Sequence, residues 1–220
     1  AAWNAPAGGR GIGQRTYLAA MLVEIIHTAS LIHDDVIDEA DTRRGRASAN
    51  AKWQSRNAVV LGDYLLARNM ELGMRSGQYD LVSYVIASIA TLCEGELLQS
   101  DRAERMEITR DAYLEIIYKK TASLLGISAG VGALSAGANR EQVARMRRFG
   151  DALGMAFQIQ DDILDFTRGA ETGKPSNNDL REHKITLPLL RLLDQSAPER
   201  RRKLVAKLSD VRNSPKNVDY

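Results

Sequence analysis

The fold is decided by the stretch IHTASLIHDDVID at residues 26–38, which ends in the acidic pattern Asp34-Asp35-x-x-Asp38. A second copy of this pattern closes the stretch FQIQDDILD at residues 157–165. Each copy continues an apolar periodicity of three and four residues, which indicates a long amphipathic helix. Carboxylates at i and i+4 share one helix face, and the one at i+1 lies about 100° around. The candidate metal ligands are therefore Asp34, Asp35 and Asp38 in the first motif and Asp161, Asp162 and Asp165 in the second.

Acids gathered in this way need cations. Two like charges ~4 Å apart repel by roughly 4 kcal/mol at an effective dielectric of 20. Mg²⁺ prefers oxygen ligands, takes one or two carboxylates per ion and completes its octahedron with water and phosphate oxygens. A single acidic pattern of this kind is usually a solvated helix end. Two copies, each continuous with an apolar stripe, favour a magnesium site that serves a phosphorylated substrate.

The remainder of the chain also has helical periodicity, at residues 59–72, 81–98, 113–125 and 143–166. Helix-start residues stand at the breaks: capping boxes at Asn139 with Gln142 and at Ser196 with Glu199, and N-caps at Asp80 and Thr109. No alternating run requires a sheet. The sequence predicts an all-α fold in one domain spanning residues 1–220, with the two motifs on two long facing helices.

Composition favours a soluble protein of the cytoplasm. The 30 Lys and Arg nearly balance the 28 Asp and Glu, which does not argue for a nucleic-acid partner. The single cysteine, Cys93, fits a reducing compartment and is expected to be a small buried side chain. The apolar stretch at residues 124–137 is short and broken, so no transmembrane segment is expected. The first 16 residues lack the layout of a signal peptide.

These motifs resemble those of the trans-isoprenyl (polyprenyl) diphosphate synthases, most closely the long-chain, octaprenyl-type branch. Residues 26–38 with TRRG at 42–45 are similar to the first aspartate-rich region, and residues 157–165 to the second. Further similar pieces stand in the right order between residues 17 and 195: GD at 62–63, GE at 95–96 with Gln99, KKTA at 119–122, GK at 173–174, NDL at 178–180 and KITLPL at 184–189.

The resemblance implies a bundle of about ten helices around a central active-site cavity, assembled as a homodimer. It implies a prenyltransferase that condenses an allylic prenyl diphosphate with isopentenyl diphosphate to give a trans polyprenyl diphosphate. It also implies Mg²⁺ as cofactor, with three ions per active site. Peripheral contact with a membrane would serve the release of an apolar product.

The resemblance also gives roles to basic and polar residues. His27 lies nearly two turns before Asp34 on the same face and is expected to contact the diphosphate of the second substrate. Arg43 is expected near the metal-bound allylic group, and Arg44 at the second diphosphate. The alternative is that both arginines neutralise neighbouring acids. The groups expected around the allylic diphosphate are Lys120, Lys174 and Lys184, with Thr121 and Gln158 as neutral donors.

Two small residues bear on product length. In family members with short products, bulky aromatic residues stand four and five positions before the first aspartate. The corresponding residues are Ser30 and Ala29, so we expect products beyond fifteen carbons. The alternative is that the small residues permit close helix packing.

The sequence departs from the family in two places. The family's Gly-Gly-Lys-x-x-Arg-Pro segment has only an incomplete and displaced counterpart in GGR at residues 8–10, and the family is usually longer. We therefore expect the chain to be incomplete at the isopentenyl-diphosphate-binding segment and at the C-terminus. Three alternatives remain at this stage: a terpene cyclase of the same fold, a non-catalytic subunit of a heteromeric synthase, and a helical bundle that only buffers metal.

Overall fold

The computed structural model describes residues 12–43, 45–105, 109–166 and 185–213. The helices are α1 Gln14–Ile37, α2 Ala49–Trp53, α3 Ser55–Arg75, α4 Tyr79–Arg105, α5 Arg110–Ile117, the π-helical turn η2 Tyr118–Ala122, α6 Ser123–Ser135, α7 Arg140–Asp165, α9 Leu187–Asp194 and α10 Pro198–Asn213. Two short strands, β1 Thr42–Arg43 and β2 Arg46–Ala47, pair as an antiparallel hairpin. The prediction of an all-α fold is confirmed, and the number of helices among the described residues is close to the ten expected.

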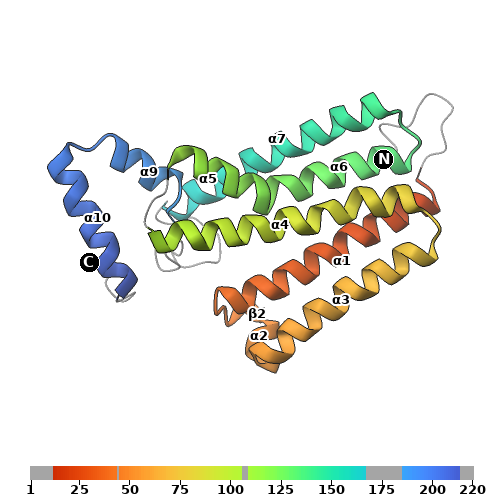
Figure 1. The fold of residues 1–220 in the computed structure, drawn as a ribbon, viewed down its shortest axis with the longest axis horizontal. Helices are drawn as coiled ribbons and strands as arrows, with labels where there is room; N and C mark the ends of the chain where they lie inside the picture. The colour runs from red at the N-terminus through yellow and green to blue at the C-terminus, as the bar shows by residue number, and fades with distance from the viewer. Residues whose placement is uncertain (1–11, 44, 106–108, 167–184, 214–220) are drawn as a thin grey trace.

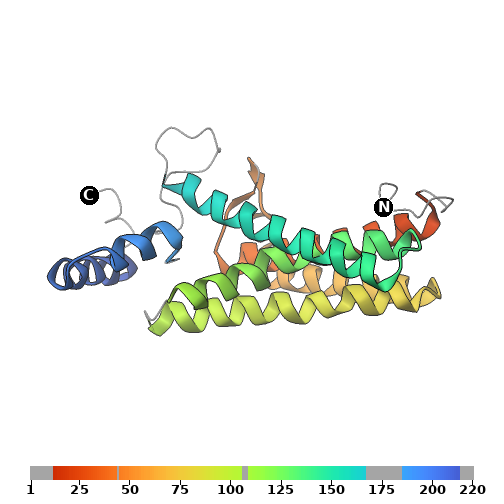
Figure 2. The ribbon, with the colours of Figure 1, turned by 90° about the horizontal axis from the view of Figure 1, so that it is seen from above.

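The long helices lie side by side in one bundle (Figures 1 and 2). Helix α6 packs against α7, α4 and α1, and α3 packs against α1. Because α1 and α7 run in the same direction and both end in an acidic motif, the two motifs lie at the same end of the bundle (Figure 1). Helix α6 packs against both α1 and α7 and lies between these two helices. The two motifs are therefore carried by helices that do not pack directly against each other.

The main core holds the opposite end of the bundle together. Its buried residues come from α1, α4 and α6: Ala19, Leu22, Ile26, Leu81, Val82, Val85, Ile127 and Val131. Complete burial of a side chain of this kind contributes about 1.5–3 kcal/mol. A smaller cluster of Tyr113, Ile117 and Leu190 joins α5 to α9. The main core thus fixes the end of the bundle opposite the motifs, while the smaller cluster packs beside the second motif, where Tyr113 bonds Asp162.

Helix starts show where local sequence rules succeed. Asn139 and Gln142 form the predicted capping box, each side chain bonding the other residue's backbone N–H, and Thr109 caps α5. The prediction for Asp80 was wrong: it lies inside the first turn of α4, where Arg15 binds it. The prediction for Ser196 was also wrong, because its hydroxyl donates to the Leu192 carbonyl at the end of α9.

Two further expectations need correction or addition. Cys93 is exposed on α4 rather than buried. In the described part of the chain, two helices, Gln14–Ile37 and Tyr79–Arg102, are long and apolar enough to cross a membrane by length and composition, and neither contains the apolar stretch at residues 124–137. This is weak evidence of a membrane span, since core helices pass the same test and both helices contribute to the main core.

Candidate functional site

The first motif forms the last turn of α1, and its middle acid points into the protein. The side chain of Asp35 is only 4% exposed, and its Oδ1 accepts a hydrogen bond from Arg43 Nε at 2.7 Å. The β1–β2 hairpin, which turns at Gly45 with φ +72°, returns Arg43 to the end of α1. Asp34 and Asp38, one turn apart, are half-buried on a different face. The nearest acid to Arg43 is thus a motif residue, not one of the acids in the following loop.

Asp34 lies where charge is crowded. Burial raises its pKa to about 6, with a further increase from Glu96 on α4 and from Asp38. Lys120 and Arg43 lower its pKa but do not cancel the increase. A carboxyl whose ionised form is disfavoured in this way gains most from a bound cation. The surroundings of Asp34 therefore fit a divalent metal.

The π-helical turn η2 contributes two adjacent residues to the site. Lys120 Nζ lies 2.6 Å from Glu96 Oε1 and donates to Gln99 Oε1 at 3.1 Å, both on α4. The next residue, Thr121, donates its hydroxyl hydrogen to Gln158 Oε1 on α7 at 2.7 Å. One short turn thus connects the helix beside the first motif to the helix that carries the second.

The middle acid of the second motif is also held by the protein. Asp162 is 3% exposed; it accepts hydrogen bonds from Gln158 Nε2 at 2.8 Å and from the Tyr113 hydroxyl at 2.6 Å. Burial raises the pKa of Asp162, and these two hydrogen bonds oppose that shift. Asp161, by contrast, is exposed. The chain Thr121, Gln158, Asp162 and Tyr113 is a continuous polar network from η2 to α5.

No group of three or more acids, histidines or cysteines in the described part of the chain lies close enough together to hold a metal ion by itself. This arrangement is compatible with Mg²⁺, which takes few protein ligands and completes its shell with water and phosphate. The assignment of all six acids as metal ligands stays a prediction.

The remaining predicted residues of α1 lie below the motif. Ala29 is fully buried, and the Ser30 hydroxyl donates to the backbone oxygen of half-buried His27 at 2.9 Å. His33 packs onto α3 over Gly62, where a Cβ would overlap its ring.

Some site residues lie outside the described part of the chain, and others were not predicted. Arg44, Lys174 and Lys184 fall outside the described residues, as does the GGR segment at 8–10. Sequence reasoning missed Tyr113, whose only signal was apolar periodicity. Glu96 belongs to the GE pair at residues 95–96, and its contact with Lys120 was not predicted.

Comparison with known proteins gives this arrangement a family. The family model described as "Polyprenyl synthetase" matches residues 7–220. A short chain isoprenyl diphosphate synthase of Methanothermobacter thermautotrophicus is 36% identical over 85% of this chain and 59% of its own length. Component 2 of the heptaprenyl diphosphate synthase of Geobacillus stearothermophilus is 44% identical over 80% of this chain and 56% of its own.

A solved structure agrees with these relatives. A polyprenyl synthase from Caulobacter crescentus, complexed with calcium and isoprenyl diphosphate, has a TM-score of 0.77 and 35% identity, covering 90% of this chain and 67% of that one. The chain belongs to the polyprenyl synthetase family. It spans less than three fifths of the length of the two curated relatives.

Proposed function

We propose that this protein is a magnesium-dependent prenyltransferase that condenses an allylic prenyl diphosphate with isopentenyl diphosphate to give a trans polyprenyl diphosphate. One observation carries the proposal: Lys120 and Thr121, neighbours in η2, reach the surroundings of the first and of the second acidic motif respectively. A diphosphate held between the two motifs would meet a cation and a neutral donor from the same turn.

The acids divide by their surroundings. Asp34, Asp38, Asp161 and Asp165 are the proposed metal ligands, whereas Asp35 and Asp162 position Arg43 and Gln158 through the hydrogen bonds described above. Bound Mg²⁺ supplies electrostatic stabilisation of the departing diphosphate. The donor set supports this assignment, since Mg²⁺ prefers carboxylate oxygens and Glu96 on α4 adds a further negative charge near Asp34. Three ions per site remain the expectation from the family.

This reaction requires the protein to stabilise charge and to position the substrates, and it requires no covalent nucleophile. The carbon–oxygen bond of the allylic diphosphate breaks, and its electron pair leaves with the diphosphate. Lys120 and Arg43 offset the growing negative charge, while Thr121 and Gln158 orient the phosphate oxygens. The double bond of isopentenyl diphosphate forms the new carbon–carbon bond, and the released diphosphate accepts the proton that is then lost. The apolar helix faces exclude water, which would otherwise capture the carbocation.

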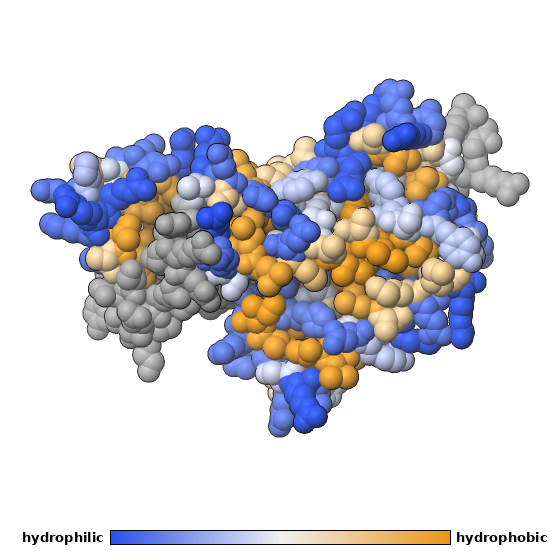
Figure 3. All heavy atoms as spheres, in the orientation of Figure 1, coloured by the Kyte–Doolittle hydropathy of each residue, from blue (hydrophilic) through white to orange (hydrophobic). Residues whose placement is uncertain are grey.

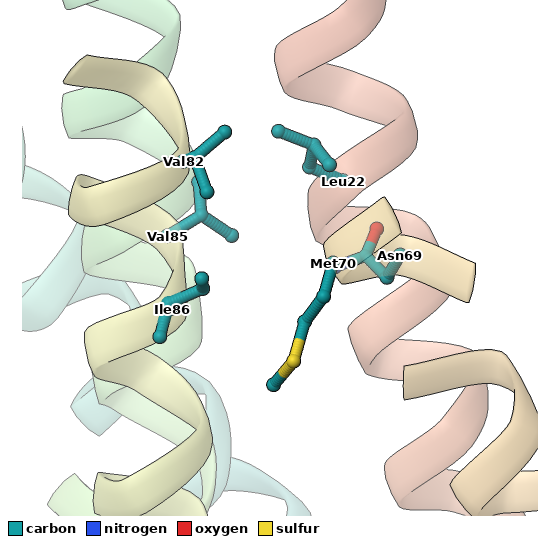
Figure 4. Close-up of a pocket in the computed structure, with 6 residues that line it drawn as sticks. All are labelled: Leu22, Asn69, Met70, Val82, Val85 and Ile86. Atoms are coloured by element: carbon teal, nitrogen blue, oxygen red, sulfur yellow. The ribbon is translucent and has the colours of Figure 1, made fainter. Parts of the chain in front are cut away.

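Product length is proposed to exceed fifteen carbons. A narrow gap lies between α1, α3 and α4, with no room for a water molecule as it stands, and Figure 4 shows the residues that line it: Leu22, Asn69, Met70, Val82, Val85 and Ile86. Leu22 stands seven residues before Ala29 on the same face of α1, ~10 Å further from the motif. We propose that a chain that grows past Ala29 displaces these side chains and enters this gap. The more similar of the two curated relatives is a heptaprenyl synthase component.

Assembly is proposed to be a homodimer through α3 and α4. Both helices expose large apolar side chains: Val60, Tyr64, Met70 and Met74 on α3, and Tyr79, Ile86 and Leu97 on α4. Figure 3 shows apolar residues on the face of the molecule where these helices are seen. Light scattering tests this directly: Leu97→Arg should convert a dimer into a monomer. A wild-type monomer that pairs only with a second, different chain would support a heteromer, as the name of component 2 suggests for that relative.

One assay tests the whole proposal. The purified protein is incubated with Mg²⁺, an allylic diphosphate and isopentenyl diphosphate, and the products are identified by mass. Elongated diphosphates support the synthase, and cyclised hydrocarbons would identify a terpene cyclase. No product would point to a non-catalytic subunit or a metal buffer and would refute the proposal for this chain. A cytoplasmic location, with peripheral membrane contact at product release, belongs to the same proposal.

A further inference from the structure

We propose that Gly95 of α4 is a positioning residue that sets where Lys120 stands for diphosphate binding. It acts as the centre of a clasp formed by Glu94, Gly95 and Glu96 of α4 with Lys119 and Lys120 of η2. The inference rests on the proposed function only in naming the ligand as the allylic diphosphate.

The first observation is a close approach of two helices. A Cβ at Gly95 would lie 2.9 Å from Lys119 Cβ, 2.9 Å from Lys120 Cγ and 3.1 Å from the Lys120 backbone nitrogen. Such distances require the neighbour to shift, and one of these neighbours is backbone. Helix α4 thus enters the notch between the two lysine side chains, and only glycine fits at the point of contact.

The second observation is a pair of ionic contacts on either side of the glycine. Lys119 Nζ lies 3.1 Å from Glu94 Oε2 and 3.1 Å from Glu115 Oε1, while Lys120 Nζ lies 2.6 Å from Glu96 Oε1. Hydrogen bonds to Glu115 and Glu94 raise the pKa of Lys119. Each glutamate next to Gly95 holds one lysine, so the two lysines are drawn apart and Lys120 is directed toward Asp34.

The third observation is the local helix geometry. The clasp contacts a π-helical turn, which is rare, is less favourable than α-helix and often occurs at functional sites. The other side of this turn meets α7 at Gly154, where a Cβ would overlap Ala122. The π-helical turn is therefore seated between glycines of α4 and α7. A displacement of the turn would move Lys120 and Thr121 together, and with them the alignment of the two motifs.

Gly95→Ala tests the clasp. The added methyl must push η2 away from α4 by a few tenths of an ångström or more. We expect the KM for the allylic diphosphate to rise about tenfold, because small misplacements of a charge-stabilising group are costly. The KM for isopentenyl diphosphate should stay within about twofold, since Lys120 serves the other substrate. A general loss of folded protein would lower turnover without producing this selective rise.

Two matched variants control for the substitution itself. Gly132→Ala on α6 has no atom within 4 Å of the added methyl, whereas at Gly130 the added methyl would overlap the hydroxyl and ring of Tyr84, which makes Gly130→Ala a control for overlap away from the clasp. Both should keep the wild-type KM for the allylic substrate. Should Gly95→Ala fail to fold, Lys119→Ala decides the matter, because it removes the outer ion pairs and no backbone contact. We expect Lys119→Ala to raise the same KM severalfold.

Binding of inorganic diphosphate with Mg²⁺, measured by calorimetry, separates the inference from the proposed function. Weaker binding in Gly95→Ala and Lys119→Ala, with wild-type binding in both control variants, would support the clasp even if the wild type made no product. A wild type that elongates substrates while Gly95→Ala keeps its allylic KM and its diphosphate affinity would overturn the clasp and leave the synthase proposal standing.

Discussion

Removal of the Tyr113 hydroxyl should destabilise the protein through buried Asp162. Tyr113→Phe preserves the ring in its core cluster and deletes one of the two hydrogen bonds that this carboxylate receives. A hydrogen bond to a charged, buried group is worth about 1.5–3 kcal/mol. For a domain of this size, 1 kcal/mol shifts the thermal midpoint by roughly 2–4 °C, so the expected decrease is about 3–12 °C. Tyr17→Phe, at an exposed tyrosine, is the matched control.

The pH dependence makes this prediction sharper. The pKa of Asp162 is raised above its usual value in the folded protein, so its ionisation opposes folding as pH rises through the range above 3.8. The Tyr113 hydrogen bond lowers the pKa of Asp162. Its loss should raise this pKa further and so widen the pH range over which ionisation of Asp162 opposes folding. The stability difference between wild type and Tyr113→Phe should therefore be largest near pH 7.5 and small near pH 4. Urea unfolding at both values measures it.

A double-mutant cycle decides whether Asp162 is the cause. In an Asp162→Asn background, the charge-dependent part of the Tyr113→Phe effect should vanish. An effect below about 0.5 kcal/mol at pH 7.5, or one that is unchanged by Asp162→Asn, would show that the hydroxyl does not support the carboxylate.

Three further outcomes follow from the same contacts. With chelator present, Asp34→Asn should raise the thermal midpoint at pH 7.5 and not at pH 4. The pKa of Asp34 is raised from 3.8 to about 6, so its ionisation lowers stability as pH rises between these values and the loss is complete above about pH 6. Mg²⁺ should stabilise only the wild type. Arg43→Met should destabilise by about 1–3 kcal/mol through unpaired Asp35, and adding Asp35→Asn should restore stability but not turnover. Ala29→Phe should shorten the product more than Ile86→Phe, which lies deeper; equal product profiles by mass spectrometry would contradict the proposed route.

Helix positions could be predicted because the 3.6-residue period and the capping residues are local signals. Asn139 and Thr109 illustrate this, since each binds a backbone N–H three residues ahead. The N-cap prediction for Asp80 failed because an aspartate that could cap a helix can also pair with an arginine distant in sequence. Arg15, its partner, lies 65 positions away. The β1–β2 hairpin carried no periodic signal, as each strand is only two residues long.

The π-helical turn could not be predicted, because apolar periodicity continues through residues 113–125 without a visible break. In a π turn the hydrogen bonds join residues five apart instead of four, so the side chains that follow point in different directions. In this protein the effect is visible only in which helix each side chain contacts. Lys120 bonds to α4 and Thr121 to α7, and this division depends on glycines at positions 95 and 154 that are distant in sequence.

The middle and outer acids of each motif have different surroundings because of helix geometry and burial. Residues at i and i+4 share a face, and the residue at i+1 lies about 100° around. When the shared face is turned toward a polar site, the i+1 position is turned toward the neighbouring elements, where Asp35 and Asp162 are both only 3% exposed. A buried carboxylate persists there only with donors, and Arg43 and Tyr113 provide them. The middle acids thus fix the end of each helix, and the outer acids remain the proposed metal ligands.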